Sequence, residues 1–464
     1  MKRLITAFPA LLICFTLCAK DDPRLIKASR YEKSGWIFVH LEGSPREIGY
    51  QHGYLLANEI DDALHMMKVL LKHNSGKDWN FYRQAVKKLS FWTKIDKEYQ
   101  DEISGIVEGL KAKGKTYDID DLLALNGFIE LSQYYVPYLA EKIKAGSGNN
   151  KAPGNCSGFV ATGSYTRDGK IVIGHNNWID YATGERWNII GDIVPARGSH
   201  ILMDMFPGFI HSGDDFAVTS AGIVVTETTI TQFKGFDEKG IPEFERARKA
   251  VQYANSIDDF VKIMTTGNNG GYANDWLVGD IKTNEIARLE LGLKNYKVWR
   301  THDGIYFGSN FPSDEKIIAE ETTFNPKDSA SSPNARKKRW ENITKQYKGK
   351  IDENTGKIME GDSYNELTHS KDNNSCVIAG RVDTDPRGVP QWSWKPFFPG
   401  GTVQGKITTA ALAKDMKLWA HMGNPSGEDF IAAPFFAKHP EYKWESGFLH
   451  DMKSYSWTLF EAKK

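Results

Sequence analysis

The sequence predicts an α+β fold in which helices stack on antiparallel sheets. Three observations carry this prediction. Residues 44–144 consist mostly of amphipathic helical segments, and from residue 156 onward the chain changes to strands joined by tight turns and mixed with helices. A small, polar stretch rich in Gly and Pro, residues 145–155, separates the two parts and indicates an exposed loop.

The composition is that of a folded protein without a polyanionic partner. The 464 residues suffice for one large domain or two to three smaller ones. Lys plus Arg and Asp plus Glu both number 59, so the formal net charge is zero. Nucleic-acid-binding proteins usually carry a basic excess, so we expect no nucleic-acid partner. The 13 Trp, 19 Tyr and 24 Phe argue against a disordered chain.

The N-terminus has the pattern of a secretory signal. A basic start at residues 1–3 is followed by an uncharged stretch to Ala19 and by the polar residues 20–22. We therefore expect a signal peptide at residues 1–19, a secreted or periplasmic protein (in a lysosome-like compartment if the source is eukaryotic), and no stable membrane insertion after signal removal. An uncleaved anchor and a lipoprotein signal ending at Cys18 are the alternatives.

Signal removal would leave two cysteines, Cys156 and Cys376. Exported proteins usually pair their thiols or avoid them. The two cysteines therefore either form one disulfide, or at least one of them is kept for chemistry.

The first part of the chain begins with a buried strand and continues in helices. Residues 35–41 are apolar enough for a buried strand. Ser44, Pro45 and Glu47 form a capping box with Pro at the first helical position, so we expect a long helix from there to about His73. The spacing of Gly49 and Gly53 on this helix indicates close packing against another element. Further helices are predicted at residues 78–95, 97–113 and from 118 onward.

The second part opens with a hairpin. Strands at 156–163 and 170–177 flank a turn at 167–169. We also predict strands near 187–193, 199–206, 215–219 and 222–230, a hairpin at 275–281 and 285–291, helices at 242–254, 257–264, 331–347 and near 408–419, and a last strand near 455–460.

Local motifs for metals and nucleotides are missing from the sequence. The histidines show no His-Glu-x-x-His pattern, and the cysteines show no Cys-x-x-Cys pattern. There is no Gly-x-Ser-x-Gly elbow, no phosphate-binding loop and no dinucleotide fingerprint. We therefore expect no metal and no cofactor, with a three-ligand metal site assembled from scattered residues as the alternative.

The most informative segment surrounds Cys156. This cysteine follows Asn155 at the junction between the loop and the first hairpin strand, and the second strand ends in His175, Asn176 and Asn177. The hairpin should bring these polar side chains close to the thiol. A thiol needs a base to become a nucleophile. If the chain were cut before Cys156, the new α-amino group of that residue would be a base within reach. An ordinary buried thiol is the alternative.

These motifs, in their order, resemble phospholipase B-like proteins and the related acyl-transferases of the penicillin acyl-transferase type. Both groups belong to the N-terminal nucleophile hydrolase superfamily. The resemblance is carried by residues 155–159, the turn at 168–169, residues 174–178, residues 43–53, residues 271–276, and Pro399-Gly400-Gly401 with Lys406.

The resemblance implies a four-layer αββα sandwich and a precursor that cuts itself between Asn155 and Cys156. The mainly helical segment 20–155 and the catalytic segment 156–464 would then stay associated. The implied reaction is hydrolysis of a linear amide or ester through a thioester on Cys156. The Asn274 side chain and a backbone N–H would hold the oxyanion.

Other residue roles follow from the same resemblance. His175 is assigned to self-processing and to positioning of the amine, with a hydrogen-bonded core histidine as the alternative. Supporting roles fall to Ser157, Asn176, Asn177 and Trp178. The resemblance also implies an arginine near the nucleophile, for which Arg336 is the first choice and Arg339 the second; a solvated basic helix face is the alternative.

The expected substrates are small N-acyl compounds, peptides or lipids. A true phospholipase B or lysophospholipase and an acyltransferase are alternatives within the same chemistry. An exported carbohydrate-binding protein that stacks its Trp side chains on sugars is the alternative from another class, although scattered Trp residues more often belong to the core.

Overall fold

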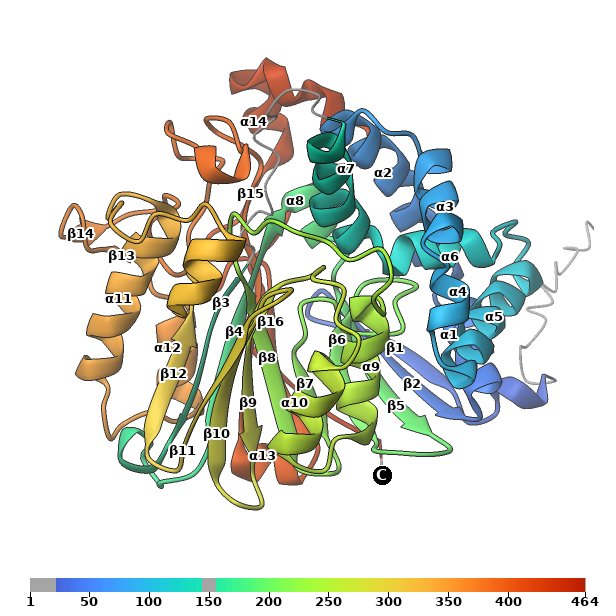
Figure 1. Cartoon of the computed structure of the whole chain (residues 1–464), viewed down its shortest axis with the longest axis horizontal. Helices are drawn as coiled ribbons and strands as arrows, with labels where there is room; N and C mark the ends of the chain where they lie inside the picture. The colour runs from blue at the N-terminus through green and yellow to red at the C-terminus, as the bar shows by residue number, and fades with distance from the viewer. Residues whose placement is uncertain (1–21, 144–155, 464) are drawn as a thin grey trace, which may run out of the picture.

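A computed structural model describes residues 22–143 and 156–463 (Figure 1). The predicted signal peptide and Asn155 lie outside the described residues. Within the described ranges, no helix has the length and apolar character needed to cross a bilayer.

Two large sheets form the centre of the molecule. The nine-stranded sheet has the order β1-β2-β5-β6-β7-β8-β9-β10-β11 and the six-stranded sheet the order β12-β3-β4-β15-β16-β17. The strands of the larger sheet are β1 (Ser29–Lys33), β2 (Trp36–Gly43), β5 (Ile189–Pro195), β6 (Ile201–Met205), β7 (Ala217–Thr219), β8 (Ile223–Thr229), β9 (Asn274–Asp280), β10 (Glu285–Leu291) and β11 (Tyr296–Thr301). Those of the smaller sheet are β12 (Gly304–Gly308), β3 (Cys156–Thr162), β4 (Val172–Asp180), β15 (Gly400–Thr409), β16 (Lys417–Met422) and β17 (Thr458–Glu461).

The two sheets pack face to face. One apolar cluster contains Val160 and Ile173 from the smaller sheet together with Leu202, Val224 and Leu277 from the larger one. Apolar side chains on alternate positions of each strand therefore form the layer between the sheets.

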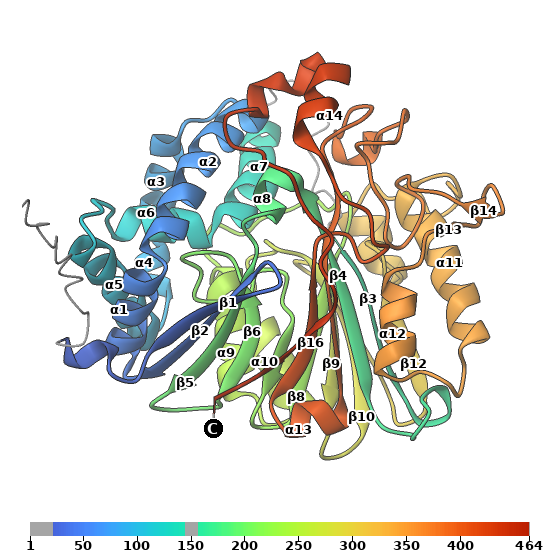
Figure 2. The ribbon, with the colours of Figure 1, turned by 180° about the vertical axis from the view of Figure 1, so that it is seen from behind.

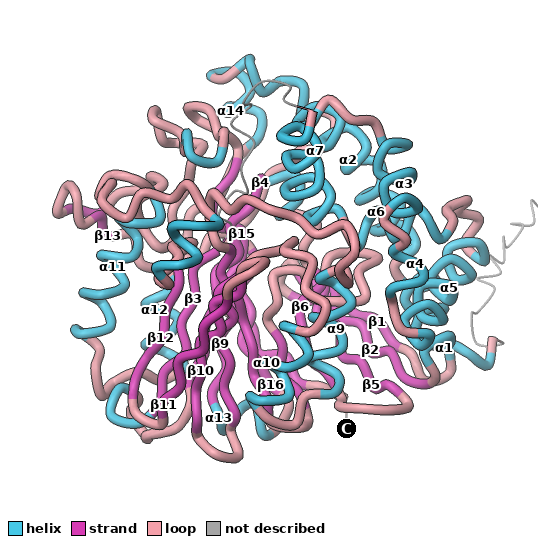
Figure 3. Tube along the Cα trace, in the orientation of Figure 1, coloured by secondary structure: helices cyan, strands magenta, loops and turns pink. Residues whose placement is uncertain are grey.

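Helices cover both outer faces (Figures 2 and 3). On the larger sheet lie α1 (Pro45–Leu55), α9 (Glu243–Tyr253) and α10 (Ile257–Thr265). The other helices of the first segment pack in the same apolar core: α2 (Ala57–Ser75), α3 (Trp79–Lys88), α4 (Phe91–Lys94), α5 (Lys97–Ala112), α6 (Ile119–Asn126) and α7 (Val136–Lys142). On the smaller sheet, Trp340 of α11 (Ser332–Gln346) and Met359 of α12 (Glu353–Glu360) pack against Phe159 and Val172. The predicted α+β, four-layer αββα arrangement is confirmed.

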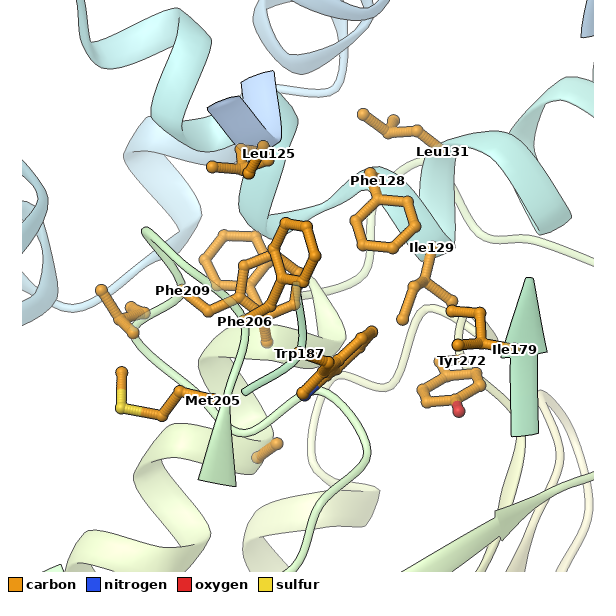
Figure 4. Close-up of a cluster of buried hydrophobic side chains, with 14 of the residues drawn as sticks. Leu125, Phe128, Ile129, Leu131, Ile179, Trp187, Met205, Phe206, Phe209 and Tyr272 are labelled. Atoms are coloured by element: carbon orange, nitrogen blue, oxygen red, sulfur yellow. The ribbon is translucent and has the colours of Figure 1, made fainter. Parts of the chain in front are cut away.

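The segment before residue 144 shares its core with the rest of the chain. β2 pairs in parallel with β5. Figure 4 shows aromatic side chains of both segments in one cluster, and the ring of Phe128 lies 6.2 Å from that of Phe206 and 5.8 Å from that of Phe209, centroid to centroid.

Most predicted elements are present, including both hairpins and the helix at 331–347. The predicted helix from 44 to 73 is wrong in one respect, because it is broken at Leu56, whose backbone leaves the helical region (φ −114°, ψ 22°). The predicted helix at 78–95 is likewise interrupted, at Ser90, whose φ of 55° is left-handed. Neither position carries a Pro or Gly that would reveal the break.

The predicted helix near 408–419 is wrong. The chain there forms the end of β15, the short helix α13 (Ala410–Lys414) and the start of β16. The helix-forming residues at 410–414 fill only the connection of a hairpin, because the flanking segments are buried in the sheet.

The expected close packing at Gly49 and Gly53 is confirmed. A β-carbon on Gly49 would overlap the carbonyl oxygen of Glu102, and one on Gly53 would overlap that of Ile106, both on α5. On the other side of the contact, Gly105 meets the backbone of α1 in the same way. Small residues on both helices therefore let the two backbones approach.

We predict that Gly49→Ala lowers the free energy of unfolding by about 2–3 kcal/mol, because the added methyl group forces α1 and α5 apart. Gly447→Ala is the matched control, since a β-carbon there would meet no atom within 4 Å. Urea unfolding of both variants checks the prediction, and equal midpoints would contradict it.

Candidate active site around Cys156

The register of the smaller sheet brings the predicted polar residues to the cysteine. Cys156 at the start of β3 pairs with Asn177 of β4, Ser157 with Asn176, and Gly158 with His175. All of them are buried. Alternation along the strands turns Cys156, His175 and Asn177 toward the larger sheet, and Ser157, Asn176 and Trp178 toward α11 and α12.

Three polar contacts hold Cys156. Its backbone N–H donates to Oδ1 of Asn310 at 3.3 Å. Its carbonyl oxygen accepts from Nη1 of Arg336 at 2.8 Å. Its Sγ donates to Oε1 of Glu227 at 3.1 Å. Both backbone polar atoms and the sulfur of the candidate nucleophile are therefore held by separate elements.

The environment of the Cys156 thiol disfavours its ionised form. Cys156 has no exposed surface. Burial and the nearby Glu227 carboxyl raise the pKa of the thiol well above its ordinary value. A base must therefore take the proton before the sulfur can attack a carbonyl carbon.

Arg336 lies at the cysteine, whereas Arg339 does not. Besides Cys156, the Arg336 guanidinium donates to Ser157 Oγ at 2.9 Å and to Asn310 Oδ1 at 2.8 Å. It lies 4.5 Å from the Trp178 ring centroid, and burial lowers its pKa to about 9. Arg339 forms ion pairs with Asp362 and Glu366 instead.

Asn310 is fixed by a second contact. It follows β12, and its Nδ2 donates to the carbonyl oxygen of Thr229 at 3.0 Å. This bond turns the amide oxygen toward the Cys156 nitrogen and Arg336. The sequence analysis missed Asn310, because its partners lie far away along the chain.

Asn274 contacts the Glu227 carboxyl group, which the Cys156 thiol contacts as well. The surrounding acceptors assign the orientation of its amide: with the nitrogen turned toward them, it donates to Glu227 Oε2 at 2.8 Å and to the Ala273 carbonyl oxygen at 3.0 Å. The Tyr272 hydroxyl donates to Glu227 Oε1 at 3.0 Å. An oxyanion bound by the Asn274 amide would therefore have to replace one of these acceptors.

Glu227 stands in the middle of β8 and is fully buried. Burial and the carboxyl of Asp215 raise its pKa well above the ordinary value. The sequence analysis missed Glu227, although one signal was available. It is the only charged residue in the otherwise neutral strand segment 223–229, and a buried carboxyl in a central strand usually has a specific partner.

His175 is close to the thiol without bonding to it. Ligand-type atoms of Cys156, His175 and Glu227 all lie within 4.8 Å of one another. Within the described parts of the chain, neither ring nitrogen of His175 has a hydrogen-bond partner, and Nδ1 is 3.9 Å from Asp214 Oδ2. Burial and the charge of Lys406 lower the His175 pKa to about 3.

The remaining predicted residues shape the surroundings. Asn176 Nδ2 donates to the Glu360 carbonyl oxygen at 2.6 Å, and Trp178 Nε1 to that of Ile378 at 3.1 Å. Asn177 is buried beside Cys156, and its Nδ2 has no partner among the residues that the structure describes.

Lys406 belongs to a buried ion-pair group. Its Nζ donates to Asp204 Oδ2 at 2.8 Å and also to Asp214, both of which are contributed by the larger sheet or the loop that follows β6. Because Lys406 is paired with His175 in the register of β15 and β4, these contacts join the two sheets beside the nucleophile.

A second group of metal-ligand side chains is buried in the molecule. His211, Asp215 and Glu243 also place ligand-type atoms within 4.8 Å of one another. Neither group follows a local spacing pattern, because Glu227 in the first and Glu243 in the second come from segments far from their partners.

Both cysteines of the described residues are free thiols. The disulfide alternative for Cys156 and Cys376 is therefore wrong. Cys376 is buried, and its Sγ accepts from Arg387 Nη2 at 3.3 Å.

A cleft of about 210 Å³ lies near the site. Its apolar lining includes Leu70, Phe128, Ile179, Trp392 and Phe398. Trp392 also lies near Arg336, whose guanidinium is 5.6 Å from the Trp392 ring centroid.

Comparison with known proteins gives one consistent family. The model of the family described as Phospholipase B matches residues 44–299. An uncharacterized protein of Archaeoglobus fulgidus is 29% identical over 324 residues, covering 64% of this chain and 51% of that protein. The putative phospholipase B-like 2 of Rattus norvegicus is 22% identical over 352 residues, covering 64% of this chain and 56% of that protein. The chain thus spans about half the length of the curated relatives it matches.

Among solved structures, a variant of the conjugated bile acid hydrolase from Clostridium perfringens is 12% identical with a TM-score of 0.33, covering 57% of this chain and 89% of that one.

We predict that Arg336→Met lowers the free energy of unfolding by about 3 kcal/mol, because it removes the guanidinium that donates to the buried Cys156 carbonyl oxygen and Ser157 Oγ, as well as one of the two donors to the Asn310 amide oxygen. Arg339→Met is the control and should cost about 1 kcal/mol, since that arginine is a partly exposed ion-pair partner. Urea unfolding measures both, and a larger loss for Arg339→Met would contradict the assignment.

Proposed function

This chain belongs to the phospholipase B family, and on that premise we propose that it is a self-processing hydrolase whose nucleophile is Cys156. The observation that carries the proposal is the arrangement at this residue. Asn310, Arg336 and Glu227 hold its nitrogen, its carbonyl oxygen and its sulfur respectively. An ordinary core cysteine needs none of these contacts.

Self-processing would cut the peptide bond between Asn155 and Cys156. The freed α-amine of Cys156 has an ordinary pKa close to neutral, and it is attached to the residue that carries the sulfur. The Asn310 amide oxygen, which now accepts from the backbone N–H, would then accept from this amine. His175 would help to position the amine from the neighbouring strand.

The two fragments would remain one folded unit. β2 from the first fragment pairs with β5 from the second, and the aromatic cluster around Phe128 is built from both. A cut before Cys156 removes one covalent bond and leaves these contacts in place.

In the hydrolysis, Cys156 Sγ would attack the carbonyl carbon of a linear amide or ester. The amine or alcohol leaves after proton uptake, and water then hydrolyses the thioester. The Asn274 side-chain amide would donate to the developing oxyanion in exchange for its bond to Glu227 or Ala273.

The apolar cleft beside Trp392 supports an acyl group as the part of the substrate that is bound. Small N-acyl compounds and peptides are our first candidates. A phospholipase B or lysophospholipase activity is the second, favoured by the family membership and by the same cleft. Transfer of the acyl group to an amine in place of water uses the same thioester.

The sugar-binding alternative finds little support, because five Trp side chains are fully buried: Trp36, Trp178, Trp187, Trp276 and Trp340.

We predict that the purified wild-type protein runs as two fragments of roughly 15 and 34 kDa on a denaturing gel, given signal removal and the cut before Cys156. Cys156→Ala should give a single uncut chain without hydrolase activity, because no sulfur is present to attack the peptide bond. Cys376→Ala is the matched control and should be cut like the wild type. A cut Cys156→Ala variant would contradict the proposal.

We predict that Asn274→Ala lowers kcat by about 100-fold, because it removes one donor to the oxyanion. The assay uses N-acyl amino acids, short peptides and lysophospholipids with the processed protein. Asn354→Ala, an exposed residue of α12, should leave kcat unchanged. Equal kcat values for the two variants would exclude Asn274 from the reaction.

A further inference from the structure

Self-cleavage poses a problem that hydrolysis does not. The α-amine of Cys156 can act as a base only after the cut, so the first proton must leave the thiol by another route. We infer that the Glu227 carboxylate accepts the Cys156 thiol proton during self-cleavage. This inference rests on the proposed function.

The contact geometry favours Glu227 over its neighbours. The thiol already donates to Glu227 Oε1 at 3.1 Å, which is the path that proton transfer needs. His175 is within 4.8 Å, yet neither of its ring nitrogens forms a hydrogen bond with Sγ. The carboxyl group thus has a path to the proton that the imidazole lacks in this arrangement.

Two further hydrogen-bond donors hold the Glu227 carboxyl group in place beside the sulfur. The Tyr272 hydroxyl bonds to the same Oε1 at 3.0 Å, and the Asn274 amide bonds to Oε2 at 2.8 Å. A carboxyl group held at both oxygens loses little conformational freedom when the reaction begins. Its strand, β8, lies in the larger sheet opposite β3, so the packing of the two sheets sets this contact.

The environments of the two candidate bases also differ in their effect on basicity. Burial and Asp215 raise the Glu227 pKa, which makes its carboxylate a stronger proton acceptor. Burial and Lys406 lower the His175 pKa to about 3, which makes its imidazole a weaker one.

Water is the only added reactant that the self-cleavage needs. The S–H bond breaks, its proton moves to Glu227 Oε1, and the sulfur forms a bond to the carbonyl carbon of Asn155. The C–N bond then breaks, and the proton passes from Glu227 to the departing nitrogen of Cys156. Water hydrolyses the thioester, which leaves a carboxylic acid on Asn155 and a free thiol and amine on Cys156.

Proton transfer to Glu227 also prepares the oxyanion site. A carboxylate beside Asn274 would repel negative charge on a carbonyl oxygen and would compete for the amide N–H. The protonated carboxyl group repels that negative charge less and competes less strongly for the Asn274 N–H. The negative charge of Glu227 is therefore neutralised in the same step in which negative charge develops on the carbonyl oxygen.

The test follows cleavage of the newly made full chain in a cell-free translation over time. Glu227→Gln should slow the cut at least about 100-fold, because an amide of the same shape cannot take a proton. Glu445→Gln is the matched control. It replaces another fully buried carboxyl, in the 3-10 helix η7 (Pro440–Glu445) outside both sheets, and should be cut at the wild-type rate.

The outcomes separate this inference from the proposed function. An uncut wild-type chain would overturn the proposed function itself. A wild-type chain that is cut, with Glu227→Gln cut equally fast, would overturn only the role of Glu227. Loss of cleavage in His175→Gln with normal cleavage in Glu227→Gln would show that the His175 imidazole, and not Glu227, accepts the thiol proton. A Glu227→Gln variant without a cooperative thermal transition would be misfolded, and its cleavage would then say nothing about the proton. In that case the size-matched variants Glu227→Asp and Glu227→Asn are compared, and only the Asp variant, which keeps a carboxyl group, should be cut.

Discussion

The hydrogen bond between a fully buried thiol and a buried carboxyl is the interaction on which the site depends. It joins the two sheets, because Cys156 belongs to one and Glu227 to the other. In water such a pair would contribute little. In the buried layer between the sheets it disfavours ionisation of the thiol and gives the thiol proton one direct acceptor. Arg336 and Asn310 hold the backbone of the same cysteine, so its nitrogen, its carbonyl oxygen and its sulfur are all fixed by hydrogen bonds.

The architecture explains how a cut in the main chain could be tolerated. The helices before residue 144 form their core with strands that come later in the sequence, and β2 is an internal strand of the larger sheet. Separating the fragments would expose this shared core to water, and the free-energy cost of exposing large apolar surfaces is high. The cut that we propose before Cys156 would therefore leave the folded structure in place.

The sequence predicted those parts of the site that local rules control. Two strands joined by a tight turn have a defined register, so the proximity of His175 and Asn177 to Cys156 followed from the hairpin, and the motif order indicated the family that the comparisons confirm. Glu227 and Asn310 were missed because only the packing of distant strands brings them to the cysteine. The helix break at Leu56 and the hairpin at residues 400–422 were missed for a related reason, since sheet burial and helix packing overrode the local propensity there.

N-terminal sequencing of the purified, active protein tests the central claim most directly. The account predicts a fragment that begins Cys156-Ser157-Gly158-Phe159, together with the N-terminal fragment in equal amount. An active preparation whose Cys156 remains inside an uncut chain would contradict it, because the base assigned to the hydrolysis would not exist.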